Sequence, residues 1–331
     1  MVINIPIVSI CCLTYNHEPY IRQCLDGFMM QKTDFPLEIL IHDDASTDKT
    51  ADIIKEYEAK YPNIIKPIYQ TENQYSKGIK ISASYNFPRA QGKYIALCEG
   101  DDYWTDSNKL QKQVDFLEAN DDVSMCFHNA NMINTEGNKI GDHKRYHSDQ
   151  YVPVEDIIWG GGIFCPTASI IFRTQYVKSG YPDFCLNCHV GDYPLQLYLS
   201  VRGKVYYFDS EMSVYRRGMP GSWSQAFLKK DISLKMDNWM SEFKMLDGIN
   251  ALFDYKYASA IAKRQEIFLC DILSQNINEK SKIRKKFKTY ISKFSIKGKI
   301  KIFLIYHALF FYRRFFEILF RVRHLAKKSN T

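Results

Sequence analysis

Residues 94–104 read YIALCEGDDYW, an apolar run that ends in two adjacent carboxylates, Asp101 and Asp102. Such a run is typical of a buried strand, and in open α/β sheets ligands bind just outside the carboxyl ends of the strands. Two oxygen donors at that place suit Mg²⁺ or Mn²⁺, because these cations prefer oxygen ligands and are often shared with the phosphates of a substrate. The alternative is that the two Asp side chains cap a helix that begins near Asn108.

Two earlier strands end in polar side chains in the same way. Residues 37–42 (LEILIH) precede Asp43 and Asp44, and residues 7–13 (IVSICCL) precede Thr14. Helix-length segments separate these strands, and the alternation predicts an α/β fold, with a mostly parallel mixed sheet flanked by helices. In this half of the chain helices are expected at 18–30, 47–60, 80–90 and 108–120, and further strands at 64–69, 94–98 and 123–128.

The pattern changes after residue 129. Residues 130–162 are polar and Gly-rich, and we expect a long connection that runs over the edge of the sheet or over the site. Beyond it, strands are expected at 168–172, 205–208 and 212–215, a helix at 195–201, and a helical region from residue 223 to residue 326.

The charge of the chain is unevenly distributed. Residues 280–331 hold 16 Lys and Arg against one acid, whereas the remainder holds 28 basic and 36 acidic residues. An acidic body argues against a nucleic-acid-binding main domain, and the basic tail favours an anionic surface as partner, with nucleic-acid binding by the tail as an alternative. The apolar run at 302–312 is too short to span a bilayer, but its flanking cations and aromatic residues suit a helix lying in a membrane interface. The alternative is a helix pair that packs on the rest of the protein or on a second subunit.

The cysteines and the N-terminus indicate the compartment. Residues 1–6 lack the basic start and apolar stretch of a signal peptide, and several of the nine Cys residues lie in apolar runs. We therefore expect a cytoplasmic chain with reduced, buried thiols.

Three motifs in this order resemble family 2 glycosyltransferases: Thr14-Tyr15-Asn16, DDASTD at 43–48 and EGDDYW at 99–104. The resemblance covers residues 7–215. It implies a GT-A fold, a nucleotide-diphosphate sugar as donor, and inversion at the anomeric carbon. The domains expected from it are a GT-A catalytic domain at 1–222 and a helical extension at 223–331 with a basic amphipathic tail from about residue 280. Within the first, 1–129 would be the nucleotide-sugar-binding half and 130–222 the acceptor-side half.

The resemblance also assigns roles on the donor side. Leu13 is placed among the donor-binding residues, Tyr15 is expected to stack on the nucleotide base, and Asp44 to accept a hydrogen bond from it. Uracil offers an imide N–H for that bond, so the resemblance favours a UDP-sugar. Asp102 is expected to bind the metal, and Asp101 the sugar or ribose. The alternative is capping of the following helix by Asp44 or Ser46, and Asp44 can in principle fill both roles.

Asp192, in the segment GDYPL, matches the family's carboxylate at the acceptor side and is the expected catalytic base. Its alternative role is that of a helix N-cap, because Pro194 lies just inside the first turn. Arg216 and Arg217 lie where many relatives have a His near the metal or diphosphate. Either Arg is expected to supply the positive charge for the donor diphosphate, and solvation at the surface is the alternative.

The sequence therefore predicts a metal-dependent glycosyltransferase that moves a sugar from a UDP-sugar to a hydroxyl of a lipid-linked glycan during cell-surface polysaccharide assembly. It would work in the cytoplasm, peripherally on the inner face of a bacterial cell membrane. The alternative is a membrane-attached nucleotide-sugar-binding or scaffold protein without turnover.

Overall fold

The computed structural model describes residues 5–178, 180–219 and 227–307. The chain divides into two compact units, Met1–Lys230 and Asp231–Thr331. The domain boundary expected at 222/223 lies outside the described residues, as does the part of the tail beyond residue 307.

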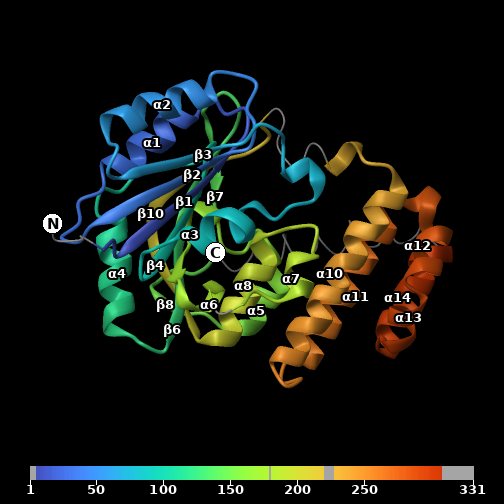
Figure 1. Ribbon diagram of the computed structural model, residues 1–331. Coiled ribbons are helices and arrows are strands. Elements are labelled where there is room, and N and C mark those ends of the chain that lie inside the picture. The colour runs from blue at the N-terminus through green and yellow to red at the C-terminus, as the bar shows by residue number, and fades with distance from the viewer. Residues whose placement is uncertain (1–4, 179, 220–226, 308–331) are drawn as a thin grey trace. The chain divides into compact units, whose positions relative to one another are not determined.

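A single mixed sheet forms the centre of the first unit (Figure 1). Along the sheet the strand order is β3-β2-β1-β4-β9-β6-β10-β5, with β7 paired to β6 and β8 to β10. The pairs β1–β2, β1–β4, β2–β3 and β6–β10 are parallel, and β9 is antiparallel to both β4 and β6. The strands are β1 Val8–Thr14, β2 Leu37–Asp43, β3 Ile65–Tyr69, β4 Tyr94–Glu99, β5 Tyr103–Trp104, β6 Val123–Ile133, β7 Lys139–Asp142, β8 Gln150–Tyr151, β9 Ile171–Arg173 and β10 Lys204–Arg216.

Helices flank this sheet, so the predicted α/β architecture is confirmed. The segment expected to be helical at 80–90 is a π-helical turn, Ser82–Asn86, that continues into a short α-helix. The α-helices of the first unit are α1 Ile21–Met29, α2 Thr50–Lys60, α3 Phe87–Arg89, α4 Lys109–Ala119, α5 Val154–Gly160, α6 Gln175–Lys178, α7 Asp183–Leu186 and α8 Asp192–Arg202.

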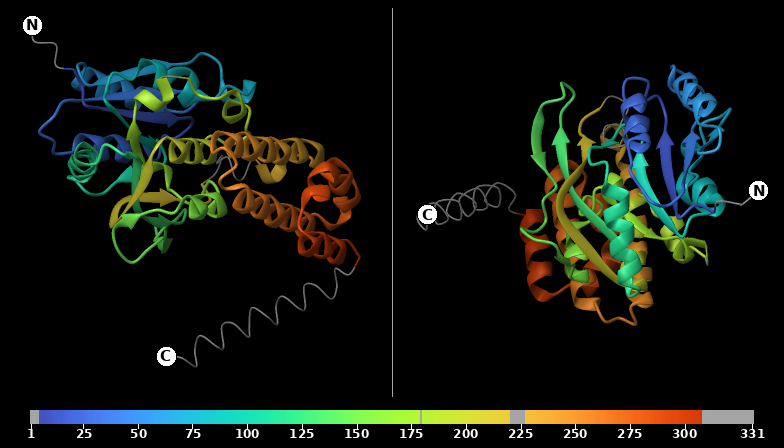
Figure 2. Two further views of the ribbon diagram at one scale, coloured as in Figure 1. Left: turned by 90° about the horizontal axis from the view of Figure 1, so that it is seen from below. Right: turned by 90° about the vertical axis from the view of Figure 1, so that its left-hand side faces the viewer.

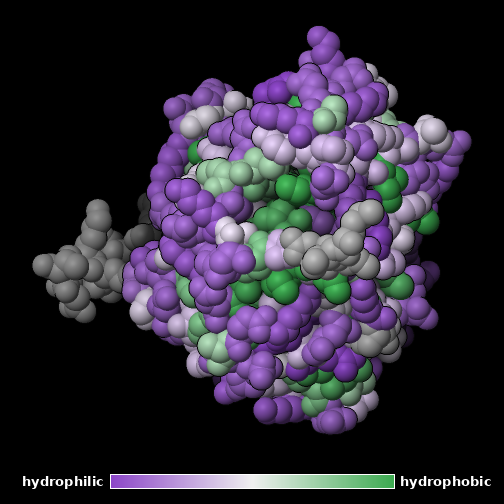
Figure 3. Space-filling model, turned by 60° about the vertical axis from the view of Figure 1, so that its left-hand side comes forward, coloured by the Kyte–Doolittle hydropathy of each residue, from purple (hydrophilic) through white to green (hydrophobic). Residues whose placement is uncertain are grey.

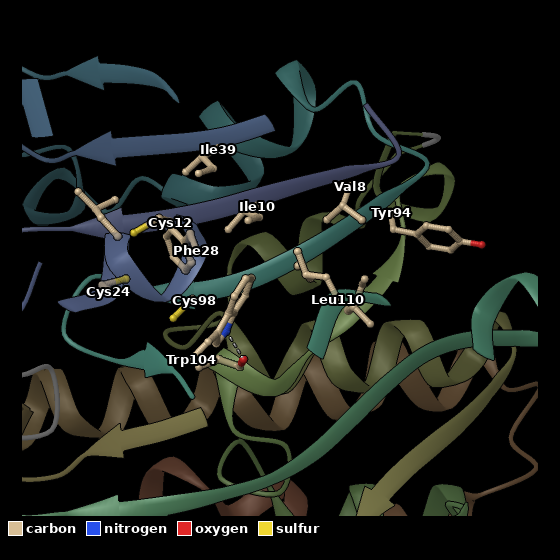
Figure 4. Close-up of a cluster of buried hydrophobic side chains, with 14 of the residues drawn as sticks. Val8, Ile10, Cys12, Cys24, Phe28, Ile39, Tyr94, Cys98, Trp104 and Leu110 are labelled. Atoms are coloured by element: carbon tan, nitrogen blue, oxygen red, sulfur yellow. Dashed lines mark hydrogen bonds between the residues drawn. The ribbon is translucent and has the colours of Figure 1, made fainter. Parts of the chain in front are cut away.

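One face of the sheet and helices α1, α2 and α4 enclose the main core (Figure 4). Alternate residues of β1, β2 and β4 point to this face, where the inward sides of α1 and α4 cover them. Trp104 lies in the cluster with its ring 4.8 Å from that of Phe28, and its Nε1 donates to the carbonyl of Ala168 at 2.8 Å. On the face drawn in Figure 3 hydrophilic residues predominate, as expected when the apolar strands are buried.

The strand order explains why the polar strand ends form one site. β1 lies between β2 and β4, and in the parallel register Leu13 pairs with both His42 and Glu99. Thr14 pairs with Asp43 one position further along. The three predicted motifs therefore leave the sheet at the same edge, which is the edge where α/β sheets bind ligands.

Two sequence-based expectations in this unit were wrong. Residues 130–162 contain the end of β6, strands β7 and β8 and helix α5 instead of an irregular connection. Strands β6 and β7 form a hairpin whose residues are polar because much of it is solvent-exposed. The strands expected at 205–208 and 212–215 are one strand, β10, which continues through register shifts between Phe208 and Ser213. Such bulges place polar residues inside a strand and resemble a turn in sequence.

The second unit is helical. Its long helices α10, Ile232–Leu252, and α11, Ala258–Gln275, pack side by side (Figure 2). Asp231 caps α10, since its Oδ1 accepts from the N–H groups of Ser233 and Leu234. The shorter helices that follow are α12 Lys280–Lys286, α13 Lys288–Lys293 and α14 Ile296–His307. Among the described residues, none of the helices combines the length and the apolar character that crossing a bilayer requires.

Candidate active site

The loops after β1 and β2 are joined by hydrogen bonds. The backbone N–H of Asn16 donates to Oγ of Ser46 at 2.9 Å, and the N–H of Thr47 donates to Oδ1 of Asn16 at 2.7 Å. Asn16 and Ala45 both have positive φ angles, of 54° and 63°. Asn is among the residues that adopt this conformation most readily, and the hydrogen bonds hold the two loops together beside the strand ends.

Three carboxylates gather at the end of β4. Oxygen atoms of Glu99, Asp101 and Asp102 lie within 4.8 Å of one another. Burial, and then the neighbouring Asp101, raise the pKa of Asp102 well above its usual range. Burial, followed by Asp101 and Asp192, raises the pKa of Glu99 to about 8. Ionisation of all three carboxylates is therefore unfavourable without a counter-charge, and a bound cation would reduce the repulsion between them.

Asp102 offers a particular position for such a cation. Its side chain is 1% exposed, and Oδ1 accepts from the backbone N–H of Arg216 at 2.9 Å. Oδ2 is buried without a hydrogen-bond partner among the described residues. Because a buried carboxylate oxygen is costly unless a donor or cation meets it, and the neighbours are also carboxylates, the donor set fits Mg²⁺ or Mn²⁺. The capping alternative is not seen, since it is Asp106 that accepts from Asn108 at the start of α4.

Arg216 and Arg217 lie in different surroundings. The guanidinium of Arg216 donates to the carbonyl of Asp101 and lies over the rings of Tyr20 and Tyr103, at 4.8 and 4.7 Å from their centroids. Arg216 is therefore buried under the acidic loop. Arg217 is exposed, and its backbone N–H donates to the carbonyl of Ile133 at 2.9 Å.

Asp192 begins α8 and is half-buried, with Oδ1 accepting from the N–H of Tyr193 at 2.7 Å. Gly162 lies against it so closely that a Cβ at that position would be 2.7 Å from Oδ2. Burial raises the pKa of Asp192, and Lys80 opposes the rise. Because Asp192 in turn raises the pKa of Glu99, it lies within electrostatic reach of the acidic cluster.

Tyr215 connects the two parts of the site. Burial raises its pKa to about 12, with Asp102, Glu99, Asp101 and Asp192 adding to the rise in that order. All four carboxylates therefore lie near enough to Tyr215 to disfavour the ionised form of its phenol. The structure thus brings together the predicted residues Asp101, Asp102 and Asp192.

The predicted base-binding residues lie at the ends of β1 and β2. Tyr15 is 43% exposed and accessible to a ligand, and Leu13 is partly buried. Asp44 is buried, and its two oxygens accept the backbone N–H groups of Gln74 and Tyr75 at 2.8 and 3.0 Å. It therefore anchors the 74–75 turn, and its bond to a nucleotide base remains a prediction.

Four residues of the site were not assigned from the sequence: Glu99, Tyr215, Lys80 and Gly162. Glu99 stands in the quoted EGDDYW motif, so its position beside Asp101 was an available signal. Tyr215 directly precedes the predicted Arg216, so its position was an available signal as well. Lys80 and Gly162 reach the site through folding of distant segments, for which the sequence offers no local signal.

The family model described as glycosyl transferase family 2 matches residues 9–178, about half of the chain. The chain belongs to glycosyltransferase family 2. The chain is 38% identical over 222 residues to an uncharacterised protein of Mycobacterium tuberculosis, a match of 66% of this chain and 61% of the relative. It is 30% identical over 165 residues to the putative teichuronic acid biosynthesis glycosyltransferase TuaG of Bacillus subtilis, covering 50% of this chain and 62% of TuaG. The chain therefore spans about three fifths of the length of these relatives.

The fold of the chain is similar to that of S. aureus TarS, residues 1–349, solved in complex with UDP-GlcNAc. The TM-score is 0.55 at 16% identity, and the match covers 93% of this chain and 91% of that one. At that identity the likeness concerns the fold alone, and it confirms the predicted GT-A architecture.

Proposed function

We propose that this glycosyltransferase moves a sugar from a UDP-sugar to a hydroxyl group of a glycan acceptor, with inversion at the anomeric carbon. The observation that carries the proposal is a three-carboxylate cluster with a fourth carboxylate, Asp192, within electrostatic reach. An inverting displacement needs both parts, since negative charge must be stabilised on the leaving diphosphate and a proton must leave the attacking hydroxyl.

On the donor side, Glu99, Asp101 and Asp102 would hold Mg²⁺ or Mn²⁺, and Oδ2 of Asp102 is a buried oxygen without a hydrogen-bond partner among the described residues. A cation bound there supplies Lewis-acid stabilisation of the diphosphate. The exposed ring of Tyr15 is proposed to stack on uracil, Leu13 to belong to the same donor site, and Asp44 to accept from the imide N–H. A UDP-sugar donor is supported by the similar fold of TarS, which was solved with UDP and with UDP-GlcNAc.

On the acceptor side, Asp192 is proposed to act as the base. The acceptor oxygen bonds to the anomeric carbon while the bond from that carbon to the diphosphate breaks, the proton passes to Asp192, and UDP leaves. Burial raises the pKa of Asp192 and so makes it a stronger base than an exposed carboxylate. The domain roles proposed are donor binding by residues 1–129, acceptor binding by 130–222, and attachment by the helical extension.

We further propose a lipid-linked acceptor and a place on the inner face of the bacterial cell membrane. The name of TuaG, which refers to teichuronic acid biosynthesis, and the excess of cations in residues 280–331 support this setting. An enzyme docked on a membrane shares one surface with a lipid-linked substrate.

The test is release of UDP from a panel of UDP-sugars by the purified full-length protein, with Mn²⁺, with Mg²⁺ and with a chelator. We expect one UDP-sugar to be hydrolysed slowly, only when metal is present. Asp192→Asn should abolish most of this release, and Asp121→Asn, at a carboxylate with a 94% exposed side chain, is the matched control. Binding of UDP-sugars without release of UDP under any condition would favour the scaffold alternative.

A further inference from the structure

Helix α14 has two apolar faces, and its own unit covers only one of them. Ile302 and Ile305 are 3% and 0% exposed, and Gly298 lies so close to Glu266 of α11 that any larger residue would collide with that carboxylate. Oγ of Ser295, just before the helix, donates to the same Glu266 at 2.9 Å. These contacts attach the inner face of α14 to α11.

The outer face carries an apolar stripe. Ile296, Ile300 and Leu304 follow at intervals of four and are 77%, 53% and 43% exposed. At 3.6 residues per turn they lie within about 80° of one another and on the side opposite Ile302 and Ile305. A surface helix normally turns polar residues to solvent, so this stripe is an apolar face that the protein's own core does not use.

Cations border the stripe on both sides. Lys297 and Lys299 are exposed and follow Ile296 at positions that lie just outside the apolar arc. Residues 280–301 contain ten Lys and Arg and no acid. Lys285 and Lys288, on α12 and α13, are exposed and form no ion pair within the part of the chain that the structure describes.

We propose that the outer face of α14 docks on an anionic lipid surface, with Ile296, Ile300 and Leu304 inserted below the headgroups and Lys297 and Lys299 placed at the phosphates. The inference deepens the proposed function and rests on it for its biological role. Apolar side chains between lysines are the pattern of a helix that lies in a membrane interface, because lysine stems extend along apolar surface while the ammonium groups stay at the charged layer.

Two other occupants fit less well. A second copy of this chain on the stripe would bring ten cations of each copy together without an acid in the same segments, and the like charges would repel. A nucleic acid would use the cations but would leave the three aliphatic side chains in water. An anionic bilayer satisfies both the charge and the apolar stripe.

The experiment is co-sedimentation of the full-length protein with phosphatidylcholine vesicles, with and without phosphatidylglycerol, at low and at high salt. Wild-type protein should bind the anionic vesicles, and part of the binding should survive high salt, because salt screens only the charge contribution. The triple variant Ile296→Gln, Ile300→Gln, Leu304→Gln should bind at least about tenfold more weakly and lose the salt-resistant part. Gln is a good helix former, so α14 should persist, which circular dichroism checks.

The matched control is Leu234→Gln with Leu252→Gln, two exposed leucines of α10 in the same unit, which should bind as wild type does. Wild-type protein that stays in the supernatant, or a triple variant that binds as well as wild type, would overturn the proposal. So would a stripe-dependent dimer seen by light scattering, or RNA binding that displaces the protein from vesicles.

Release of UDP without vesicles is measured in parallel for the triple variant and should be unchanged. Wild-type protein that releases UDP but does not bind anionic vesicles refutes this inference alone, whereas wild-type protein that binds the vesicles but releases no UDP refutes the proposed function alone.

Discussion

The backbone N–H of Arg216 donates to Oδ1 of Asp102 at 2.9 Å and so joins two residues 114 positions apart. The guanidinium of the same Arg216 donates to the carbonyl of Asp101 and lies over the rings of Tyr20 and Tyr103. The end of β10 therefore holds the turn that carries both aspartates. Oδ1 of Asp102 is used in this contact, whereas Oδ2 is buried without a partner in the described part of the chain. The two oxygens of the Asp102 carboxylate thus differ in role: Oδ1 holds the fold together, and Oδ2 is available to a cation.

Asp102→Asn tests whether the Asp102 carboxylate binds a cation. The amide can keep the hydrogen bond from Arg216 but removes the charge, so Mn²⁺-dependent binding of UDP should weaken by at least about tenfold. Without metal the variant should be at least as stable as wild type, because an uncompensated buried carboxylate is removed. Isothermal titration of UDP with Mn²⁺ and thermal unfolding measure the two effects, with Asp121→Asn as control. Metal-dependent binding equal to that of wild type would show that Asp102 is not a ligand.

Gly162→Ala tests the position of Asp192. The added Cβ would be 2.7 Å from Oδ2 and 3.0 Å from Oδ1, so the carboxylate must shift. A base misplaced by about 1 Å can lower kcat by roughly 10²-fold, and KM for the donor should change little. Gly191→Ala is the matched control, since it also neighbours Asp192 but its Cβ would meet no atom within 4 Å.

The same substitution should have little further effect in an Asp192→Asn background, because both changes act on one group. Asp192→Asn alone should lower turnover by about 10²-fold or more, the usual contribution of a general base. Steady-state kinetics with the UDP-sugar identified in the panel measures all three variants. Additive losses in the double variant would mean that Gly162 acts on something other than Asp192.

Lys109 should make stability depend on pH. Its side chain is fully buried, with Nζ 2.8 Å from Oε1 of Gln113 and 4.1 Å from the ring centroid of Trp104. Burial lowers the pKa of Lys109 from 10.5 to about 7. Between these values the unfolded chain binds a proton that the folded chain does not, so the free energy of unfolding should rise with pH, by up to about 1.4 kcal/mol per unit.

Below the folded pKa both states are protonated, and the contribution no longer changes with pH. Urea unfolding at several pH values between 7 and 9.5 measures the slope, and Lys109→Met should reduce it relative to wild type. Lys112→Met, on the exposed side of the same helix, should leave the slope as it is. Equal slopes for Lys109→Met and wild type would show that Lys109 does not titrate in this range.

The site was predictable where local sequence determines it. Asp43, Asp101 and Asp102 directly follow apolar strands, so their place at one edge of a parallel sheet follows from strand order. The burial of Arg216 could not be predicted from the order of the strands, because it depends on the rings of Tyr20 and Tyr103, which pack against its guanidinium in the folded chain. The contact of Gly162 with Asp192 likewise joins a segment that was expected to be irregular. Strand β10 was divided in two because Asp209, Ser210 and Glu211 resemble a turn, although they form a bulge within one strand.

The two arginines at the end of β10 should separate into a structural and a donor-binding residue. Arg216 is buried and engaged, so Arg216→Ala should lower the free energy of unfolding by about 2 kcal/mol through lost packing and hydrogen bonds. Arg217 is exposed, and its hydrogen bond to Ile133 is made by the backbone N–H and not by the side chain. Arg217→Ala should therefore change the free energy of unfolding by less than about 0.5 kcal/mol. If its guanidinium binds the donor diphosphate, the same change should weaken UDP binding about tenfold, the scale of a charge-assisted hydrogen bond. Urea unfolding and isothermal titration on both variants decide the matter. Arg217→Ala with unchanged affinity for UDP would remove Arg217 from the donor site and leave the diphosphate to the metal and the loop backbone.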